Sequence, residues 1–351
     1  MEINTSKLKS MLNAVAGCKP SKLLEISNYY ELRFNINGFK LSATDGANYI
    51  NVINRDCKSE EEQVVIVKAD QFSKLINKTS SDTVNLEIKD SCLKVSSNGT
   101  YHVEIVEDEI YPTFNMSPGI QYKVNMSELR ECLNAGSNAK SNTPNDSYLY
   151  HYLLRNGEVI TTDAIKVFKG NFEIDNDMSI LIPPPLAKLV MGLTNNEATI
   201  HVGESNTRVI VEAGDVTVAG ILGEGVNEYP DLSDLFNSNF PYTATIDTQA
   251  MLQTLDRLTL FIGPYDKNLI DLVFTDEGIV INTVSKSLEV VPYISQVEGL
   301  TDEVYSINSK CLIDLISTIK QPEFNLSWGF GDILKVDTES AEMIIATADE
   351  E

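Results

Sequence analysis

Apolar residues recur at helical spacing in three segments that lie about 120 residues apart. The first begins with a polar run typical of helix N-termini, after which Leu8, Met11, Leu12 and Val15 share one face. A second helical pattern follows each of these segments by about 60 residues, directly behind a β-rich run. The sequence therefore predicts six helices, at 6–17, 69–80, 126–137, 184–193, 248–260 and 308–320.

Between these segments, apolar and polar residues alternate as they do in strands with one buried face. Residues 31–36 alternate strictly and residues 207–212 less cleanly. Pairs of turn-forming residues separate the runs, and they are Asn37-Gly38, Asn98-Gly99, Asn156-Gly157 and Ala213-Gly214. Because short turns of this kind join antiparallel neighbours, we expect antiparallel sheets.

The same order of helix, strands, helix and strands occurs three times along the chain. Tyr111-Pro112 and Tyr229-Pro230 lie 118 residues apart, each in an acidic, turn-rich stretch suited to an extended linker. We therefore expect an α+β protein of three repeated units, each with two helices packed on antiparallel sheets. The predicted domains are 1–118, 119–240 and 241–351.

The charge is divided between the helices and the rest of the chain. The 351 residues include 27 Lys+Arg and 51 Asp+Glu, for a formal net charge of −24. Such a balance excludes an ordinary basic-patch nucleic-acid binder, since an evenly acidic surface repels phosphates. The six predicted helices nevertheless carry a net charge of +4, which leaves −28 for the strands and loops. Lys9, Lys74 and Lys78 point away from the apolar helix faces.

The cysteines and histidines give little support for a metal site or for His-based catalysis. Cys18, Cys57, Cys92, Cys132 and Cys311 form no C-x-x-C pair, and we interpret them as reduced thiols. The three histidines are isolated in sequence from cysteine and from one another. The sequence therefore shows neither the grouped ligands of a zinc site nor the residues of a His-based catalytic triad. A metal site built only from carboxylates stays open.

No apolar run approaches the roughly 18–20 residues of a membrane span. The first residues lack the basic-then-apolar layout of a signal peptide. We therefore expect a cytoplasmic protein with no membrane partner.

Over its whole length the chain resembles the bacterial and phage sliding clamps, the beta subunits of DNA polymerase III. The resemblance rests on the threefold repeat, the two Tyr-Pro joins, Ala43-Thr44-Asp45-Gly46 in the first unit and Thr161-Thr162-Asp163 in the second. It implies a DNA clamp fold in which two chains pair head to tail into a ring around duplex DNA, without sequence preference. A ring of this kind holds the replicative polymerase, is placed by a clamp loader, and needs neither catalysis nor a cofactor.

The resemblance also implies three sets of site residues. DNA would meet the basic residues of the helices and of the loop after the first helix, which are Lys9, Lys19, Lys22, Lys74, Lys78, Arg130, Lys188 and Arg257. The ring would close where Tyr101 and Val103 of an edge strand meet Leu260 and Phe261 at a helix end. Partner peptides with Leu and Phe anchors would dock between the second and third units, at Leu149, Thr162, Ala164, Ile165, Lys166, Val167, Pro230 and Leu235.

Two segments depart from the pattern of the family. Ala164-Ile165-Lys166 replaces the usual small residue and basic pair after Thr-Asp. Residues 346–351 replace the usual apolar tail, which contains Pro and Arg and forms one wall of the pocket, with Ala-Thr-Ala-Asp-Glu-Glu. These departures favour a divergent lineage with its own partner peptide.

Two other functions stay open at the level of the sequence. A carboxylate-dependent hydrolase would act through Asp163 or through the Glu60-Glu61-Glu62 run. The Glu run is typical of a solvated turn, and Asp163 has a counterpart in Asp45, as a turn residue would. A protein-interaction scaffold that never encircles DNA is the other alternative, and it would be a monomer.

Overall fold

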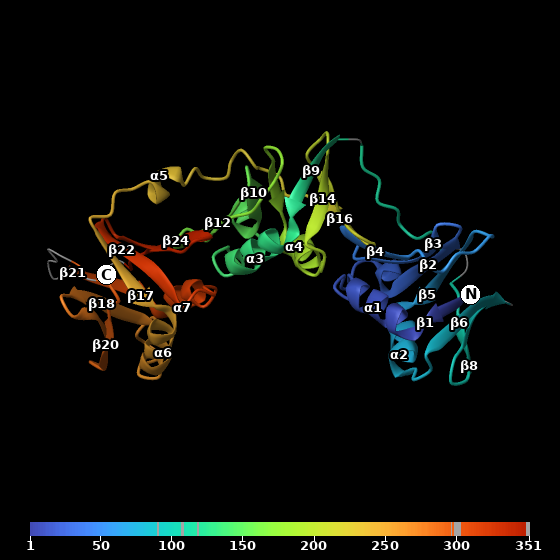
Figure 1. The fold of residues 1–351 in the computed structure, drawn as a ribbon, viewed down its shortest axis with the longest axis horizontal. Coiled ribbons are helices and arrows are strands. Elements are labelled where there is room, and N and C mark those ends of the chain that lie inside the picture. Colours follow the sequence, from blue (N-terminus) through green and yellow to red (C-terminus); the bar gives the residue numbers. More distant parts are fainter. Residues whose placement is uncertain (90, 107–108, 118, 296, 298–302, 349–351) are drawn as a thin grey trace. The chain divides into compact units, whose positions relative to one another are not determined.

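The computed structural model describes residues 1–89, 91–106, 109–117, 119–295, 297 and 303–348. The chain divides into two compact units, which are described separately below (Figure 1). Unit 1 comprises Met1–Ser127, Ile174–Asn176 and Pro183–Leu222. Unit 2 comprises Glu128–Glu173, Asp177–Ile182 and the chain from Gly223 onward.

Unit 1 contains two antiparallel sheets. The eight-stranded sheet has the order β5-β2-β3-β4-β16-β15-β14-β9, and its strands are β2 (Tyr29–Asn35), β3 (Gly38–Thr44), β4 (Asn48–Asn54), β5 (Gln63–Lys68), β9 (Gly119–Asn125), β14 (Glu197–Gly203), β15 (Arg208–Ala213) and β16 (Val216–Ile221). The four-stranded sheet has the order β1-β6-β7-β8, with β1 (Glu2–Asn4), β6 (Thr83–Lys89), β7 (Cys92–Ser96) and β8 (Thr100–Glu104). In this sheet β8 is an edge strand.

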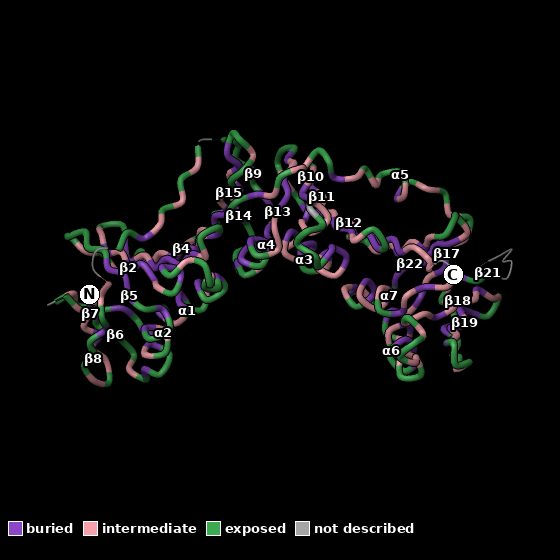
Figure 2. The backbone as a smooth tube through the Cα atoms, turned by 180° about the vertical axis from the view of Figure 1, so that it is seen from behind, coloured by how far each residue is buried: buried purple, intermediate pink, exposed green. Residues whose placement is uncertain are grey.

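The helices of unit 1 are α1 (Thr5–Val15), α2 (Ala69–Lys78) and α4 (Pro184–Met191), with a 3₁₀ turn at Glu25–Asn28. The carboxamide oxygen of Asn4 accepts from the backbone N–H groups of Ser6 and Lys7 and so caps α1. Helix α1 packs on β3 and β4 and lies beside α2 (Figure 1). Its apolar stripe, Leu8, Met11, Leu12 and Val15, is buried as the sequence predicts (Figure 2).

Unit 2 contains a second pair of antiparallel sheets. The eight-stranded sheet has the order β13-β10-β11-β12-β24-β23-β22-β17, and its strands are β10 (Tyr152–Arg155), β11 (Glu158–Thr162), β12 (Lys166–Asn171), β13 (Ser179–Ile182), β17 (Tyr242–Asp247), β22 (Glu323–Phe330), β23 (Ile333–Asp337) and β24 (Ala341–Ala346). The four-stranded sheet has the order β20-β19-β18-β21, with β18 (Leu269–Thr275), β19 (Gly278–Thr283), β20 (Leu288–Pro292) and β21 (Glu303–Asn308).

Helices α3 (Met126–Gly136, which enters unit 2 at Glu128), α5 (Ser233–Phe236), α6 (Thr248–Thr259) and α7 (Ser309–Ile316) complete unit 2, with a 3₁₀ turn at Ser147–Tyr150. Helix α3 packs closely on its sheet at Gly136. A Cβ added to this glycine would lie only 3.0 Å from the Thr161 hydroxyl. That hydroxyl donates to the Gly136 carbonyl over 2.8 Å. Helix α6 packs beside α7.

The six predicted helices are confirmed to within four residues at their ends, and the predicted turns join antiparallel strands. Asn156 and Gly157 show the physical reason, since both have positive φ, 51° and 83°, as a tight two-residue hairpin requires. Helix α5 was not predicted, because four residues are too few for a periodic pattern.

Strand pairing links segments that are far apart in sequence. β4 pairs with β16, and β12 pairs with β24, so each eight-stranded sheet takes strands from two of the predicted domains. Residues 119–240 are consequently divided between the two compact units. The boundaries of the three domains stay a prediction.

Candidate nucleic-acid and partner interfaces

The Thr-Asp motifs form two turns with the same hydrogen bonds. The Thr44 hydroxyl donates to the Asn48 carbonyl over 2.8 Å, and the Thr162 hydroxyl donates to the Lys166 carbonyl over 2.9 Å. Each Asp then accepts two backbone N–H groups through Oδ1, at 2.9 and 2.6 Å for Asp45 and at 3.0 and 2.9 Å for Asp163. Both carboxylates therefore hold turns, as their counterpart positions predict.

The turn at Asp163 differs from its counterpart at the third residue. Gly46 has a φ of 97° and Ala164 a φ of 75°, so a residue with a Cβ occupies the left-handed region in the second turn. Ala164 is exposed, and the next residue, Ile165, is 52% exposed. The turn thus presents two apolar side chains to solvent.

Lys166 lies apart from the other predicted partner-binding residues. Its Nζ donates to the Asn138 carbonyl over 2.5 Å and lies 3.1 Å from Asp314 Oδ2, and its side chain is only 8% exposed. Asp163 Oδ2 is 3.5 Å from the same ammonium group. Because side chains alternate along β12, Lys166 faces the helices while Val167 faces the opposite side of the sheet.

On that opposite side, Val167 is buried with Phe236 of α5 and Ile344 of β24. Half-buried Ile160, Leu232 and Leu235 pack against this cluster. A neighbouring cluster consists of Leu153, Leu181 and Tyr229, with Tyr148, Ile160, Val226 and Leu232 around it. The structure thus brings Val167 and Leu235 together and places Leu149 and Pro230 next to members of the second cluster. Thr162 is opposite Val167 in the strand register.

Of the segment that carries α5, the sequence reasoning named Pro230 and Leu235 but missed Leu232 and Phe236. Phe236 is a buried member of the Val167 cluster, Leu232 packs against it, and Lys169 Nζ lies 4.3 Å from the centre of the Phe236 ring. Tyr229 anchors the segment, because its hydroxyl donates to the Ile160 carbonyl over 3.4 Å and burial raises its pKa. Tyr111 is anchored similarly in unit 1, to the carbonyls of Tyr29 and Ser42. The repeated Tyr-Pro pair was the signal that could have revealed these anchors.

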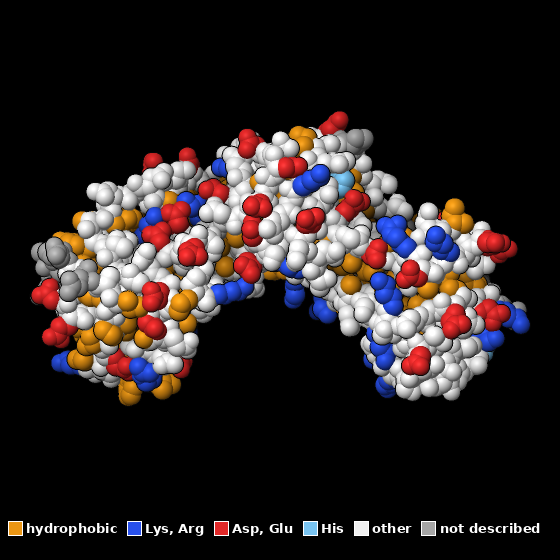
Figure 3. Space-filling view, viewed as in Figure 1, with side chains coloured by type: hydrophobic (Ala, Val, Ile, Leu, Met, Phe, Trp, Pro, Cys, Tyr) orange, Lys and Arg blue, Asp and Glu red, His pale blue; other side chains and the backbone are white. Residues whose placement is uncertain are grey.

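Some of the basic residues predicted to contact DNA are exposed to solvent, and others form hydrogen bonds or ion pairs within the protein. Lys19, Lys22, Lys78 and Lys188 are exposed. Lys9 donates to the Thr79 carbonyl over 2.8 Å at the end of α2, and Lys74 pairs with Asp70 at 2.8 Å. In Figure 3, Lys and Arg side chains follow the edge of unit 1 that bears α1 and α2, and Asp and Glu are more widely scattered.

In unit 2 the predicted cation on α6 is already paired. Arg257 Nε and Nη2 donate to the Glu289 carboxylate of β20 at distances of 2.5 to 3.1 Å. Hydrogen bonds from Arg257 lower the pKa of Glu289 and, in return, raise that of the guanidinium. Arg130 of α3 is half-buried and also interacts with other groups.

The predicted ring-closure residues lie at free edges of their units. Tyr101 is 42% exposed on the edge strand β8, whereas Val103 on the same strand is 1% exposed and belongs to the core of unit 1. Leu260 and Phe261 follow α6 and are 81% and 56% exposed. An apolar pair at this helix end therefore does not belong to the core of unit 2.

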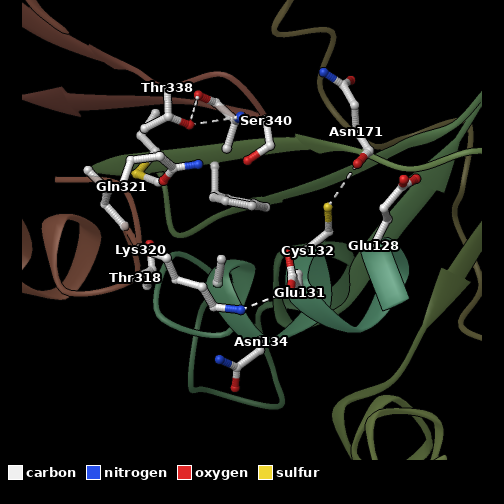
Figure 4. A pocket seen from close by; sticks show the side chains of 15 residues that line it. Glu128, Glu131, Cys132, Asn134, Asn171, Thr318, Lys320, Gln321, Thr338 and Ser340 are labelled. Atoms are coloured by element: carbon white, nitrogen blue, oxygen red, sulfur yellow. Dashed lines mark hydrogen bonds and ion pairs between the residues drawn. The ribbon is translucent and has the colours of Figure 1, made fainter. Parts of the chain in front are cut away.

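One pocket lies on the helix-bearing side of unit 2, between α3, residues 318–321 and the sheet (Figure 4). Its volume of about 90 Å³ is far below the roughly 300 Å³ of a small-ligand site. Lys320 closes one side of it through a 2.9 Å ion pair with Glu131, and the Cys132 thiol donates to the Asn171 carbonyl. This pocket is therefore too small for a partner peptide.

The structure adds one contact that the spacing of cysteines and histidines did not suggest. Cys92 Sγ lies 3.3 Å from His102 Nδ1, because β7 and β8 pair across a short hairpin. Within the described part of the chain, no group of three or more His, Cys, Asp or Glu side chains could hold a metal ion. Among the same residues, no helix is both long enough and apolar enough to cross a membrane.

No protein-family model matches the chain. The beta sliding clamp of Staphylococcus aureus is 25% identical to it over 187 residues, which are 51% of this chain and 49% of that protein. The clamp of Staphylococcus epidermidis is 22% identical over the same length. The chain thus matches about half the length of the curated relatives.

The similarity in fold extends further than the similarity in sequence. The beta subunit from the DNA polymerase of Streptococcus pyogenes superposes with a TM-score of 0.89 at 16% identity, over 99% of both chains. The DNA polymerase sliding clamp from Bacillus subtilis gives a TM-score of 0.86 at 17% identity, over 100% of this chain and 99% of that one. The resemblance inferred from the motifs is therefore confirmed, and the chain has the fold of the bacterial DNA polymerase sliding clamps over its whole length.

Proposed function

We propose that the protein is a DNA polymerase processivity factor, a homodimeric ring that encircles duplex DNA and tethers the replicative polymerase. The observation that carries the proposal is the likeness in fold to sliding clamps over 99% to 100% of the chain, together with the sequence match to clamps over half of it. The proposed ring acts in the cytoplasm and has a clamp loader as a further partner. Its three domains are residues 1–118, 119–240 and 241–351.

The charge distribution supports a ring that holds DNA loosely. Exposed Lys19, Lys22, Lys78 and Lys188 provide a few cations in a chain of formal charge −24. Each phosphate contact adds to the affinity and to its salt dependence, so many tight contacts would slow sliding. Retention by encirclement needs only weak contacts of this kind.

The exposed edges support head-to-tail pairing of two chains. β8 and β20 are edge strands of their sheets, and unpaired strand edges favour pairing with another chain. Leu260 and Phe261 would fill the apolar part of the contact, with Tyr101 on the opposite subunit. This arrangement buries the exposed apolar residues at the end of α6.

The apolar clusters beside α5 support the docking of partner peptides. Leu149, Ala164, Ile165, Pro230 and Leu235 are exposed or half-buried, and Leu235 packs against buried Val167. Short peptides with apolar anchors bind such surfaces, and the polymerase and the clamp loader would share this one.

The proposed protein is an accessory subunit without catalysis of its own. Asp163, the candidate for a carboxylate-dependent hydrolase, uses Oδ1 for two backbone N–H groups and has Lys166 beside Oδ2. A carboxylate bound in this way serves the turn and is poorly placed to activate water.

The proposal is tested by retention on circular DNA. We expect part of the protein, after long incubation with plasmid at low salt, to co-elute with the circle at high salt and to be released when a restriction enzyme cuts it. High salt screens ionic contacts but leaves encirclement intact. Equal loss from circular and linear DNA would overturn the proposal and favour a scaffold that does not encircle DNA.

A further inference from the structure

The segment beside the partner-binding surface, residues 223–240, has an apolar face and an acidic face. Val226, Tyr229, Leu232, Leu235 and Phe236 pack toward the two buried clusters. The segment also holds four carboxylates, Glu224, Glu228, Asp231 and Asp234, and no Lys, Arg or His. All four acidic residues are exposed. A ligand that binds beside this segment would therefore meet an acidic rim, which we define as these four residues.

The rim carboxylates form no ion pair within the part of the chain that the structure describes. Asp231 accepts the Ser233 N–H at the start of α5, and hydrogen bonds from the side chain and the backbone of Ser233 lower the pKa of Asp231. Among the described residues, no Lys or Arg forms an ion pair with Glu224, Glu228 or Asp234. Their charges are thus available to a ligand.

The basic side chains around the surface are already engaged. Arg155 donates to the Val226 carbonyl over 3.0 Å. Lys335 donates to the Phe236 carbonyl and pairs with Asp337 and Glu342, and Lys169 also pairs with Glu342. Burial alone would raise the pKa of Glu342, but the hydrogen bonds from these two lysines lower it, so Glu342 stays charged beside them.

Lys166 supplies no cation to this surface either. Its ammonium group is held on the opposite side of the sheet by Asp314 and the Asn138 carbonyl. The exposed turn is linked to this surface through β24, because the Ile165 carbonyl accepts the Ala346 N–H. Ala346 is opposite Ile333, and Ile333 packs against the same cluster as Leu235, the neighbour of Asp234.

We propose that this surface selects a short peptide that carries Lys or Arg beside its apolar anchors. The proposal rests on the proposed function, since it names the chemistry of the partner that the ring would hold. Apolar anchors would bind near Ile165 and Leu235, and the basic residues would approach Glu224, Glu228 and Asp234. Complementary rim charges act mainly on specificity and on the rate of association, and salt weakens them.

The test compares two labelled peptides with the same Leu and Phe anchors, one flanked by Lys and the other by Asp. We expect the full-length protein to bind the Lys peptide about tenfold more tightly at low salt, as fluorescence anisotropy would measure, and the ratio to approach one at high salt. Ile165→Ser should weaken both peptides, since it removes a shared apolar contact.

A triple variant locates the effect. Glu224→Gln, Glu228→Gln and Asp234→Asn together should remove most of the preference for the Lys peptide and leave binding of a Ser-flanked peptide unchanged. The control is Glu60→Gln, Glu204→Gln and Glu277→Gln, which removes three exposed carboxylates outside residues 223–240 and should keep the preference.

Equal binding of the two peptides, or a preference that survives the triple variant, would overturn the inference. Retention on circular DNA is measured separately. A protein that is retained on the circle but prefers the Asp peptide refutes only this inference, whereas a protein that prefers the Lys peptide but leaves the circle at high salt refutes the proposed function.

Discussion

At the scale of single residues, the two Thr-Asp turns show how a short motif fixes local geometry. In each turn the Asp carboxylate collects two backbone N–H groups, and the Thr hydroxyl donates to the carbonyl four residues later. These bonds form within six residues, so they do not depend on the rest of the fold. The sequence could therefore predict the role of Asp163, although its turn differs from the first one at Ala164, Ile165 and Lys166.

Substitutions at the third residue of the two turns should have opposite effects on the stability of the protein. Ala164→Gly should stabilise the protein by about 0.5–1 kcal/mol, because glycine adopts positive φ without the strain of a Cβ. Gly46→Ala should destabilise it by more than about 1 kcal/mol, since the φ is 97° and the new Cβ would lie 2.9 Å from Leu24 Cδ2. Urea unfolding measures both. A loss of stability in Ala164→Gly would contradict this account.

The five cysteines should differ strongly in reactivity. Burial raises the pKa of the Cys18 and Cys132 thiols to about 12, so almost no thiolate is present at about pH 8. Cys92 is half-buried beside His102. Iodoacetamide should therefore label Cys92 before these two, and raising the pH to about 9 should add little at Cys18 or Cys132, because the thiolate fraction grows only tenfold per unit. Peptide mass mapping of the native protein measures the order, and early labelling of Cys132 would refute it.

At the scale of elements, contacts between helices and neighbouring strands decide which charges are free. Helical periodicity correctly placed Lys9, Lys74 and Lys78 on the polar sides of their helices. It could not show that Lys9 caps α2, or that Arg257 is held by Glu289 of β20, 32 residues away. Such pairs depend on which strand lies beside the helix, and that is a tertiary property.

Variants of single cations should separate free from engaged charges. Lys188→Gln should weaken binding to a short linear duplex at low salt and reduce the slope of log affinity against log salt by about one. Arg257→Gln should change the affinity and the salt slope much less, because Glu289 already neutralises the guanidinium. Glu289→Gln should strengthen binding by releasing that charge. Nitrocellulose filter binding measures all three variants, and an equal loss in Lys188→Gln and Arg257→Gln would contradict the assignment.

At the scale of the whole molecule, the sheets join segments that the sequence presents as separate repeats. The pairing of β4 with β16 and of β12 with β24 builds continuous eight-stranded sheets across the predicted domain boundaries. Exposed apolar residues lie on the edge strand β8 of unit 1, at Tyr101, and at the end of α6 in unit 2, at Leu260 and Phe261. Exposed apolar residues at free edges are typical of interfaces between chains.

Charged residues at the end of α6 should abolish the dimer. Leu260→Asp with Phe261→Asp should give monomers in sedimentation at micromolar concentration, because a buried, unpaired charge costs several kcal/mol. Leu23→Asp is the matched control, since Leu23 is 98% exposed in a loop of unit 1 and should leave the dimer intact. Dissociation by the control alone, or a monomeric unmodified protein, would refute the proposed interface.

The sequence by itself determined the helices, the strands, the hairpin turns and the likeness to sliding clamps. These features depend on periodicity and on bonds between residues close in the chain, which a linear pattern records. Only the tertiary structure decided that Lys166 faces α7, that α5 covers Val167 and that Leu260 and Phe261 are exposed. Burial and pairing between distant segments arise from packing, and packing depends on the strand partners that the fold brings together.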